Sequence, residues 1–268
     1  AYEVNEEMAD VLMNRPVLEH ASNLGGLIAK DIADEAGIPA YIYDSVSVDE
    51  LSDVARITGL SEIVRTSQSH CLNMRAAAIK TAQEMGSAYT DMNLVVAHLG
   101  GGISLSAHRH GQMLDIVSDD EGPFSPERSG RLPIKNFIKL CAQHDINDIK
   151  KMVRGNGGLV SLLGTNSALE VQKRIDSGDE RARLVYEAMA YQIAKSIGEL
   201  AVVLDGEVDA IVITGGIAYS EFITEYIKKK VSFIAPVKIL PGENELESLA
   251  FGAYRVLTGE EKAHIFAE

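Results

Sequence analysis

The chain has 268 residues, of which 46% are hydrophobic and 24% are charged, as in globular proteins that bury a sizeable core. Its formal net charge of −14 argues against nonspecific binding to nucleic acid or to an anionic membrane. No apolar run is long enough to span a membrane, and the first residues do not resemble a signal peptide. Two cysteines, Cys71 and Cys141, match no metal-binding spacing, so we expect a cytoplasmic protein with reduced thiols.

The first third of the chain is predicted to run helix, strand, helix. The helices are expected at residues 23–36 and 70–85, and a short strand at residues 40–43. The first helix has apolar residues one turn apart at Leu24, Ile28 and Ile32. The strand ends at Asp44, where a catalytic or metal-binding carboxylate is common and a turn cap is equally common.

The pattern changes near Asp91, where we place a domain boundary. Three β-like runs joined by short turns then predict an antiparallel meander, at residues 94–99, 103–108 and 112–117. Further helices are expected at residues 134–143, 180–204, from about 220, and 245–257, with strands at residues 208–214 and 237–240. Alternating strands and helices with one meander predict an α/β fold with a mixed sheet.

The first turn of the meander consists of three glycines, Gly100, Gly101 and Gly102, and follows His98. Glycines let the backbone approach a ligand and aim N–H groups at it, and phosphate is the common ligand of such turns. The alternative is a hairpin that uses glycine only for positive φ. A strand follows the glycines, so the turn is neither a Walker loop nor a Rossmann fingerprint.

A second glycine turn, Gly215-Gly216, follows the strand at residues 208–214 and precedes a helix. The free N–H groups and the dipole of a helix N-terminus favour an anion. The alternative is an ordinary tight connection between a strand and a helix. Two such turns fit a fold that grips a nucleotide.

The charged segment at residues 119–131 contains two prolines and two glycines, which predict a shaped loop. Arg128 lies near its end, where a guanidinium suits a phosphoryl group in transfer. The alternative is a surface loop in which Arg128 pairs with Glu127 or Asp120.

The histidines separate into two groups by position. His20 and His70 precede helices and His98 lies inside an apolar strand, so each could donate a hydrogen bond to an oxyanion, although single histidines are more often structural. His108 and His110 alternate out of a hairpin, and we predict that both are exposed.

Taken together, several segments in one order resemble the butyrate kinases of the acetokinase family. They are residues 19–25, 97–104, 121–130, 188–195, 214–220 and 231–237. The chain resembles acetate kinases more distantly, through the His-Leu-Gly-x-Gly turn, the Arg-Ser-Gly of residues 128–130 and the Gly-Gly-Ile turn.

The resemblance implies the ASKHA fold, which is ribonuclease H-like and shared by actin-like ATPases, with two lobes and mixed sheets. Residues 1–91 would be the remainder of an N-terminal lobe on the acyl-substrate side. Residues 92–244 would form the nucleotide lobe, and residues 245–268 a C-terminal helix packing back toward the first lobe.

The resemblance also implies an enzyme that transfers phosphate between ATP and butyrate or a related short or branched acid. ATP/ADP and Mg²⁺ would be its cofactors, and a homodimer or higher homo-oligomer its assembly. The alternatives are an acetate or propionate kinase-like enzyme, and a truncated noncatalytic paralogue that keeps the fold. The sequence leaves the preferred acid open.

The resemblance assigns roles to matching residues. Arg128 would stabilise the transferring phosphoryl group, and His70 would contact it. Asp44 would lie near Mg²⁺ and the substrate carboxyl group, and Glu247 would be a metal-associated glutamate, with Glu245 as a neighbouring alternative. His20 would line the acyl side. The phosphate- and nucleotide-binding residues would be His98, Gly100, Gly101, Gly102, Gly215 and Gly216.

Three features depart from the family pattern. The family opens with a phosphate loop carrying an asparagine and soon supplies a second arginine, and neither appears before the segments matched here. Ser167-Ala168-Leu169 stands where the family has Asp-x-Arg, and the stretch between Asp115 and Glu121 is shorter than expected. With one phosphate-binding hairpin, these 268 residues alone are expected to be nearly inactive.

Overall fold

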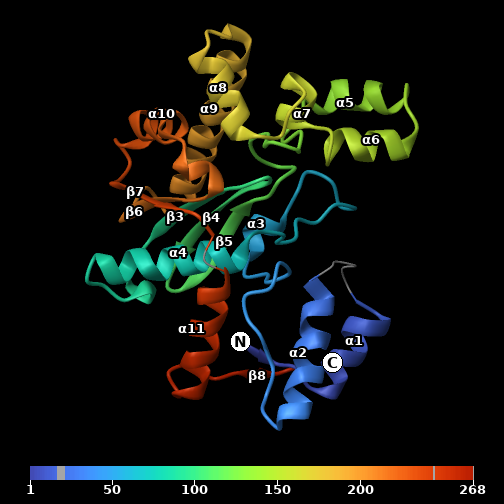
Figure 1. Ribbon diagram of the computed structural model, residues 1–268, viewed down its shortest axis with the longest axis vertical. Helices are drawn as coiled ribbons and strands as arrows, with labels where there is room; N and C mark the ends of the chain where they lie inside the picture. The colour runs from blue at the N-terminus through green and yellow to red at the C-terminus, as the bar shows by residue number, and fades with distance from the viewer. Residues whose placement is uncertain (17–21, 244, 268) are drawn as a thin grey trace. The chain divides into compact units, whose positions relative to one another are not determined.

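The computed structural model describes residues 1–16, 22–243 and 245–267, and its backbone contacts divide the chain into two compact units (Figure 1). The first unit contains Ala1–Val48 together with Asn244–Glu268, and the second contains Asp49–Glu243. The division falls earlier than the boundary we expected near Asp91, because the helix before that residue packs on the large sheet of the second unit. The assignment of residue ranges to lobes stays a prediction.

The first unit holds a small three-stranded sheet in the order β2-β1-β8. Its elements are β1 (Tyr2–Glu3), α1 (Glu6–Asn14), α2 (Ser22–Ala36), β2 (Tyr41–Ile42), α11 (Glu245–Leu257) and β8 (His264–Ile265). Val4, Met8, Ala33 and Ala40 form its buried cluster. The expected helix at residues 23–36 is present, but its apolar residues Leu24, Ile28 and Ile32 are 57–63% exposed. The side of α2 that is buried carries Gly26 and Ala33 instead.

The second unit is built on a five-stranded mixed sheet in the order β5-β4-β3-β6-β7. Its strands are β3 (Leu94–Leu99), β4 (Ile103–Arg109), β5 (Gln112–Val117), β6 (Ala210–Gly215) and β7 (Val237–Pro241). The strands β3, β4 and β5 are antiparallel neighbours, which confirms the predicted meander. The strands β6 and β7 continue the sheet in parallel with β3. The predicted α/β class with a mixed sheet is therefore correct.

Helices cover both faces of this sheet (Figure 1). The helices of the second unit are α3 (Asp53–Arg56), α4 (Cys71–Glu84), α5 (Ile134–Cys141), α6 (Ile146–Val153), α7 (Gly158–Leu163), α8 (Ala168–Asp176), α9 (Glu180–Val203) and α10 (Glu221–Val231), with short 3₁₀ helices η1 (Tyr89–Asp91) and η2 (Gly216–Tyr219). The long helix α9 packs on β3, β4 and β5, whereas α4 packs on β3 and β6 from the other side. None of the helices in the described residues is long and apolar enough to cross a membrane.

The two faces of β4 differ in polarity. Ile103, Leu105 and Ala107 join the main apolar cluster with α9, while the alternate residues are polar. Those alternate residues include His108, which is 0% exposed, so the predicted exposure of His108 is wrong. The alternation of polar residues in β4 predicts a face turned toward water. In the structure α4 covers this face, and its polar groups bond to neighbouring side chains instead. His110 is exposed, as predicted.

The free edge of β5 is covered by the segment that leads into α4. The backbone N–H of Ser52 donates to the carbonyl of Leu114 at 2.9 Å. Glu50 accepts from the backbone N–H of Met113 at 2.8 Å, and Arg65 donates to the carbonyl of Ile116 at 2.6 Å. An unpaired strand edge is a template for aggregation, so these contacts protect the sheet.

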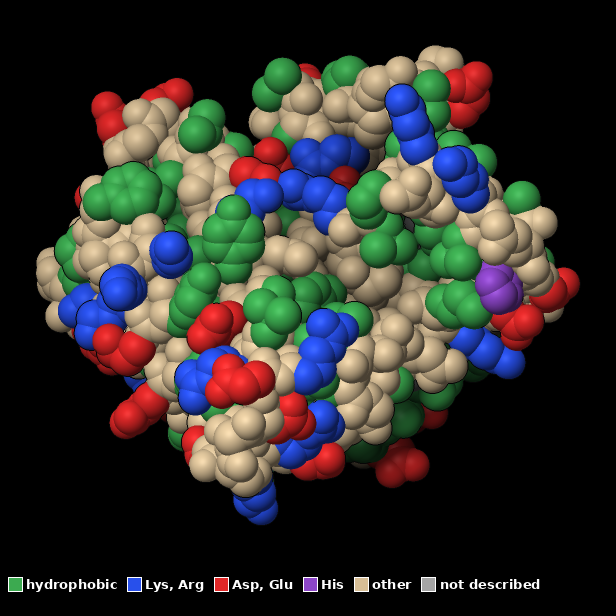
Figure 2. Space-filling model, turned by 90° about the horizontal axis from the view of Figure 1, so that it is seen from above, with side chains coloured by type: hydrophobic (Ala, Val, Ile, Leu, Met, Phe, Trp, Pro, Cys, Tyr) green, Lys and Arg blue, Asp and Glu red, His purple; other side chains and the backbone are tan. Residues whose placement is uncertain are grey.

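Charged side chains on the face seen from above are mixed in sign (Figure 2). Lys and Arg side chains lie beside Asp and Glu side chains, with hydrophobic side chains between them. Although the net charge of the chain is −14, this face carries both positive and negative side chains.

Candidate functional site

The two glycine turns meet at the carboxyl ends of neighbouring parallel strands. His98 near the end of β3 lies opposite Thr214 near the end of β6. Gly215 has φ of 91°, and a Cβ built there would lie 2.5 Å from the carbonyl oxygen of Leu99. Only glycine adopts this backbone conformation and lets the strand ends approach so closely. Carboxyl ends of strands in open α/β sheets are a common place for ligands.

The three glycines that follow β3 are not required for a positive φ angle. Gly100, Gly101 and Gly102 all lie outside the positive-φ region, so the hairpin alternative for these glycines does not hold. A Cβ at Gly102 would lie 2.1 Å from Nη1 of Arg128. A Cβ at Gly100 would lie 3.1 Å from the Nε2 of His98, whereas Gly101 faces open space. The turn therefore makes room for functional side chains, and above all for Arg128.

Arg128 is held beside the turn by Asp119. Its Nη1 lies 2.8 Å from the Asp119 carboxylate, and its side chain is 21% exposed. The Nε of Arg154 lies 3.9 Å from the same carboxylate. Burial lowers the pKa of Arg128, Asp119 opposes this, and the like charge of Arg154 adds to it. Two guanidinium groups thus lie beside one carboxylate, and the charge of Glu127 also favours the protonated form of Arg128.

The expected partners of Arg128 are engaged elsewhere. Glu127 accepts a hydrogen bond from Asn166 at 2.6 Å, and Asp120 accepts one from Ser118 at 2.6 Å. In the described residues the carboxylate that pairs with Arg128 is neither of the two expected, and the catalytic role of Arg128 stays a prediction. The adjacent carboxylate, Asp119, is the partner.

The loop that carries Arg128 is fastened to the glycine turn. The hydroxyl of Ser125 donates to the carbonyl of Gly101 at 2.8 Å, and its backbone N–H donates to the carbonyl of Arg128 at 3.0 Å. Gly130 has φ of 60°, and a Cβ there would lie 2.4 Å from the backbone nitrogen of Phe124. The prediction of a shaped loop is confirmed, and its shape determines where the guanidinium lies.

His70 and His98 lie together at the same end of the sheet. Their rings stack with centroids 4.3 Å apart and planes 24° apart. The Nδ1 of His70 lies 2.8 Å from the hydroxyl of Ser104. Burial and the neighbouring His70 lower the pKa of His98 to about 3. His98 is therefore neutral near pH 7, and its 3.5 Å contact with Glu243 is not an ion pair.

The second glycine turn differs from its prediction in one respect. Gly216 opens the 3₁₀ helix η2, and α10 begins only at Glu221, after the cap residue Ser220. The Ser220 hydroxyl accepts from the backbone N–H of Ile223 at 3.4 Å. The backbone N–H groups next to the glycines are therefore those of η2, and the first turn of α10 has its own cap.

The remaining predicted site residues belong to the first unit or fall outside the described residues. Asp44, with φ of 44°, follows β2, and Glu247 is exposed in the first turn of α11 beside Glu245. All three belong to the first unit. His20 falls at residues 17–21, outside the described residues. Acidic residues in a first helical turn also favour the helix dipole, which is a structural role for Glu245 and Glu247.

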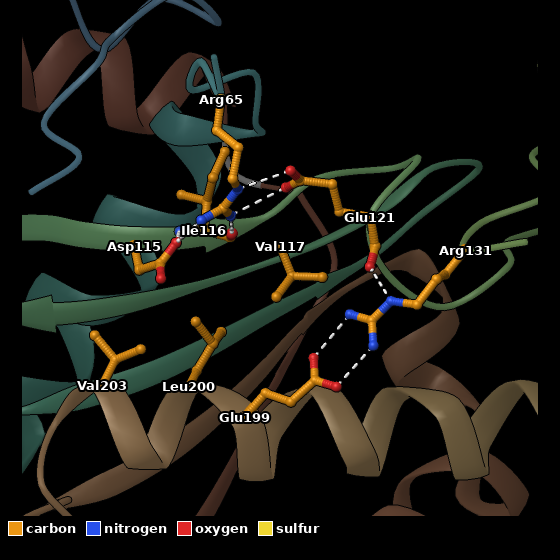
Figure 3. Close-up of a pocket in the computed structure, with 9 residues that line it drawn as sticks. All are labelled: Arg65, Asp115, Ile116, Val117, Glu121, Arg131, Glu199, Leu200 and Val203. Atoms are coloured by element: carbon orange, nitrogen blue, oxygen red, sulfur yellow. Dashed lines mark hydrogen bonds and ion pairs between the residues drawn. The ribbon is translucent and has the colours of Figure 1, made fainter. Parts of the chain in front are cut away.

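A cavity of about 440 Å³ lies elsewhere on the second unit, between β5 and α9 (Figure 3). Arg131 forms a two-pronged contact with Glu199 at 2.8 and 2.9 Å, and its Nε donates to the carbonyl of Glu121. Arg65 bonds the Glu121 carboxylate at 2.7 and 3.0 Å and contacts Asp115 at 3.0 Å. Arg131 and Arg65 thus form ion pairs with carboxylates that line the cavity. We assign this cavity no catalytic role.

Sequence reasoning missed Asp119, Arg154 and Ser104. Asp119 stands next to Asp120 in a charged run, so the sequence could not distinguish them. Arg154 comes close only because its backbone pairs with that of Arg128 in an isolated β-bridge. Ser104 carried a signal, because it is the polar residue two positions after a glycine turn on an alternating strand.

Comparison with known proteins gives a consistent result. Residues 60–261 match the model of the acetokinase family. The chain is 50% identical over 266 residues to butyrate kinase 2 of Clostridium acetobutylicum, covering 98% of this chain and 75% of that protein. It is 48% identical over 268 residues to a probable butyrate kinase 2 of Caldanaerobacter subterraneus subsp. tengcongensis, covering 99% and 76%.

Solved structures resemble the fold at lower identity. The acetate kinase of Porphyromonas gingivalis superposes with a TM-score of 0.82 at 20% identity, covering 95% of this chain and 74% of that one. A propionate kinase from Francisella tularensis gives a TM-score of 0.75 at 18% identity, covering 92% and 73%. The chain belongs to the acetokinase family, and the predicted ASKHA fold class is confirmed.

Proposed function

We propose that this chain catalyses reversible phosphoryl transfer from ATP to butyrate, or to a related short or branched-chain carboxylate, giving the acyl phosphate and ADP. The observation that carries the proposal is the cluster formed by Arg128, His70 and the Gly100–Gly102 turn at the carboxyl end of β3. Identity of 48–50% to butyrate kinases supports it over an acetate or propionate kinase-like activity, for which the likeness is 18–20%. The same identity supports an enzyme over a noncatalytic paralogue. The low activity expected of these 268 residues alone stays a prediction, which the rate in the assay below tests.

The chain's own residues would act mainly by positioning and charge neutralisation. A carboxylate is already a nucleophile at neutral pH, so the transfer to butyrate needs no strong general base. Arg128 would turn from Asp119 toward the equatorial oxygens of the transferred group, where negative charge is spread in the transition state. His70 would donate a hydrogen bond to the same group. Asp119 would keep the guanidinium close before substrate binds.

The glycine turns would hold the nucleotide. The backbone at Gly100–Gly102 can approach phosphate oxygens, with His98 buried behind it as a neutral support. Gly215 and Gly216 would lie on the adenosine side. His20 would line the acyl pocket, as the sequence resemblance implies.

Mg²⁺ is the ion that we propose to accompany the nucleotide. The described residues contain no cluster of three His, Cys, Asp or Glu side chains that could cage a metal. Mg²⁺ bound to nucleotides needs only one or two carboxylates, because phosphate oxygens and water complete its octahedron. Asp44 and Glu247 are the carboxylates that we propose for it. When bound, the ion would neutralise charge on the phosphates.

The proposal extends to the setting of the enzyme. We propose a homodimer or higher homo-oligomer in the cytoplasm, and the absence of a disulfide at Cys71 and Cys141 in the described residues is compatible with a reducing compartment. Gel filtration with light scattering tests the assembly.

An assay of acyl phosphate formation tests the function. The purified protein is incubated with ATP, Mg²⁺ and a panel of acetate, propionate, butyrate, isobutyrate and valerate, and the acyl phosphate is trapped as its hydroxamate. We expect the highest kcat/KM among the four- and five-carbon acids, and loss of turnover with a chelator. Turnover that survives the chelator would rule out the metal, and preference for acetate would favour the acetate kinase-like alternative.

A further inference from the structure

A chain of buried polar side chains begins at His70 and runs along β4. Ser104, Ser106 and His108 alternate on the face of β4 covered by α4, and each is at most 1% exposed. Met74 of α4 lies between the two serines, with its Sδ 3.7 Å from the Ser104 hydroxyl and 3.5 Å from the Ser106 hydroxyl. A thioether sulfur has no proton to donate, so Met74 can only accept a hydrogen bond, and either serine hydroxyl can donate it.

The far end of this chain has its own partners. The Nε2 of His108 lies 2.6 Å from the Ser106 hydroxyl, and its Nδ1 lies 2.7 Å from the hydroxyl of Tyr89. Arg75 donates to the Tyr89 oxygen at 3.4 Å. Burial lowers the pKa of His108 to about 3, and the charge of Arg75 adds to this, so His108 is neutral. Arginine only donates hydrogen bonds, so the Tyr89 hydroxyl can donate one to Nδ1 of His108. The single ring proton of the neutral His108 is then on Nε2, which faces Ser106.

At the other end of this row of polar side chains, Ser104 makes two contacts with His70. The Ser104 hydroxyl oxygen lies 2.8 Å from the Nδ1 of His70 and accepts from the backbone N–H of His70 at 3.4 Å. The stacked ring of His98 limits rotation of the His70 plane. A hydroxyl can donate or accept, and Ser104 has the sulfur of Met74 as a second acceptor. It can therefore donate to Nδ1 of a neutral imidazole and accept from Nδ1–H of an imidazolium.

We propose that Ser104 is a positioning residue that holds His70 through Nδ1, so that Nε2–H is the group presented to the transferred phosphoryl. The inference rests on the proposed function and deepens it. In neutral His70 the Ser104 hydroxyl donates to Nδ1 at 2.8 Å, which is a better acceptor than the Met74 sulfur at 3.7 Å, and the ring proton is then on Nε2. In the imidazolium the same hydroxyl accepts from Nδ1–H, and Nε2 keeps its proton. Orientation of an imidazole by a partner on its other nitrogen is how proteins select the donor nitrogen.

Ser106 supplies a matched control. It lies two residues away on the same strand and face, is equally buried, and contacts the same sulfur and a histidine. It differs from Ser104 in touching His108 instead of His70. We expect Ser104→Ala to lower kcat about tenfold with KM for ATP and butyrate nearly unchanged. We expect Ser106→Ala to leave kcat within about twofold while both variants lose similar thermal stability.

A double-mutant cycle separates positioning from packing. Because Ser104 acts through His70, Ser104→Ala should have no further effect on kcat when His70 is already alanine. An equal loss of kcat with and without His70, or a loss in Ser106→Ala as large as in Ser104→Ala, would overturn the proposal. If Ser104→Ala does not fold, Ser104→Cys keeps the size, weakens the hydrogen bond and should give an intermediate kcat.

Nuclear magnetic resonance of ¹⁵N-labelled histidine tests the contact without catalysis. We expect Ser104→Ala to shift the Nδ1 and Nε2 signals of His70 toward those of a tautomeric mixture, and Ser106→Ala to leave them in place. His70 signals that do not respond to Ser104→Ala would refute the proposal. A wild-type protein that makes no acyl phosphate but shows the expected shifts would refute the proposed function and leave Ser104 as the partner of His70.

Discussion

At the scale of single residues, Arg128 is the group on which the proposed transfer depends most. It is mostly buried beside the glycine turn and shares Asp119 with Arg154. In our proposal the guanidinium is already beside the turn before the phosphoryl group binds, and it would only turn from Asp119 toward that group. An ordinary surface ion pair would instead contribute about 0–1 kcal/mol and no catalysis.

Replacing Arg128 with alanine should lower kcat about 10²–10³-fold and raise the KM for ATP far less. The reason is that charge builds up on the phosphoryl oxygens mainly in the transition state. Steady-state kinetics of acyl phosphate formation measure the effect. Arg131→Ala is the control, since Arg131 pairs with Glu199 beside the separate cavity. A loss of kcat well below tenfold for Arg128→Ala would show that the residue is a structural ion pair.

Gly102 makes room for the same guanidinium, and alanine there should displace it. The added Cβ would lie 2.1 Å from Nη1 of Arg128, so the side chain must move. A displacement of about 1 Å at a reacting group can cost about 10²-fold in rate. We expect Gly102→Ala to lower kcat strongly while the protein stays folded. Gly101→Ala, whose methyl group enters open space, should cost much less, and equal losses would contradict the steric argument.

His108 and His110 are two residues apart and should respond in opposite ways. His108 is 0% exposed and bonds Tyr89 and Ser106, so His108→Ala leaves buried polar groups unsatisfied and a cavity. We expect it to lower the free energy of unfolding by about 2–4 kcal/mol. His110 is exposed at the hairpin tip, and His110→Ala should change it by less than about 1 kcal/mol. Urea denaturation compares them, and similar values would contradict this assignment.

At the scale of elements, the edge of β5 depends on the segment that precedes α4. Arg65 joins the two by donating to the carbonyls of Ala55 and Ile116 and by pairing with Glu121 and Asp115. Its side chain is 22% exposed, so these contacts are partly shielded from water. The edge strand of the sheet is therefore closed by the side chains of Arg65 and Glu50 and by the backbone contact of Ser52.

Removing this side chain should loosen the edge. We expect Arg65→Ala to lower the free energy of unfolding by about 1–3 kcal/mol and to increase aggregation on heating. Arg56→Ala is the control, because Arg56 lies in the same segment and pairs with Asp49 at the surface, which should cost less than about 1 kcal/mol. Chemical denaturation and light scattering measure both effects. If Arg65→Ala and Arg56→Ala had equal free energies of unfolding, the edge would be held by the contacts of Ser52 and Glu50 without Arg65.

At the scale of the whole molecule, ligand binding should stabilise the chain. The groups that we propose for phosphate binding all belong to the second unit, which also holds the large apolar core. A ligand that binds only the folded state at 100 times its Kd adds about 2.7 kcal/mol. We expect ATP with Mg²⁺ to raise the melting temperature of this unit by roughly 5 °C or more. Calorimetry with and without nucleotide measures it, with Arg128→Ala and chelator as controls, and an unchanged melting temperature would argue against a nucleotide site.

Several elements followed from the sequence because their cause is local. The meander at residues 94–117 has alternating or continuous apolar runs and turn residues between them, and the structure has it. The helix α4 ends at Glu84, and Gly86, with φ of 72°, follows its cap residue Met85, as a glycine after a helix predicts. Local propensity and periodicity act within a few residues, so the linear order is enough to reveal them.

Tertiary structure decided which partner each polar group has. The alternation in β4 was visible, but only the packing of α4 over that face showed that His108 and Ser104 are buried and mutually bonded. The choice of Asp119 over Asp120 for Arg128 depends on how a loop with Gly130 at positive φ folds back onto the turn. The sequence by itself determined the family, the sheet's order of strands along the chain and most of the candidate residues. Distances between residues far apart in the chain, which decide burial, charge and orientation, arise only when the elements pack.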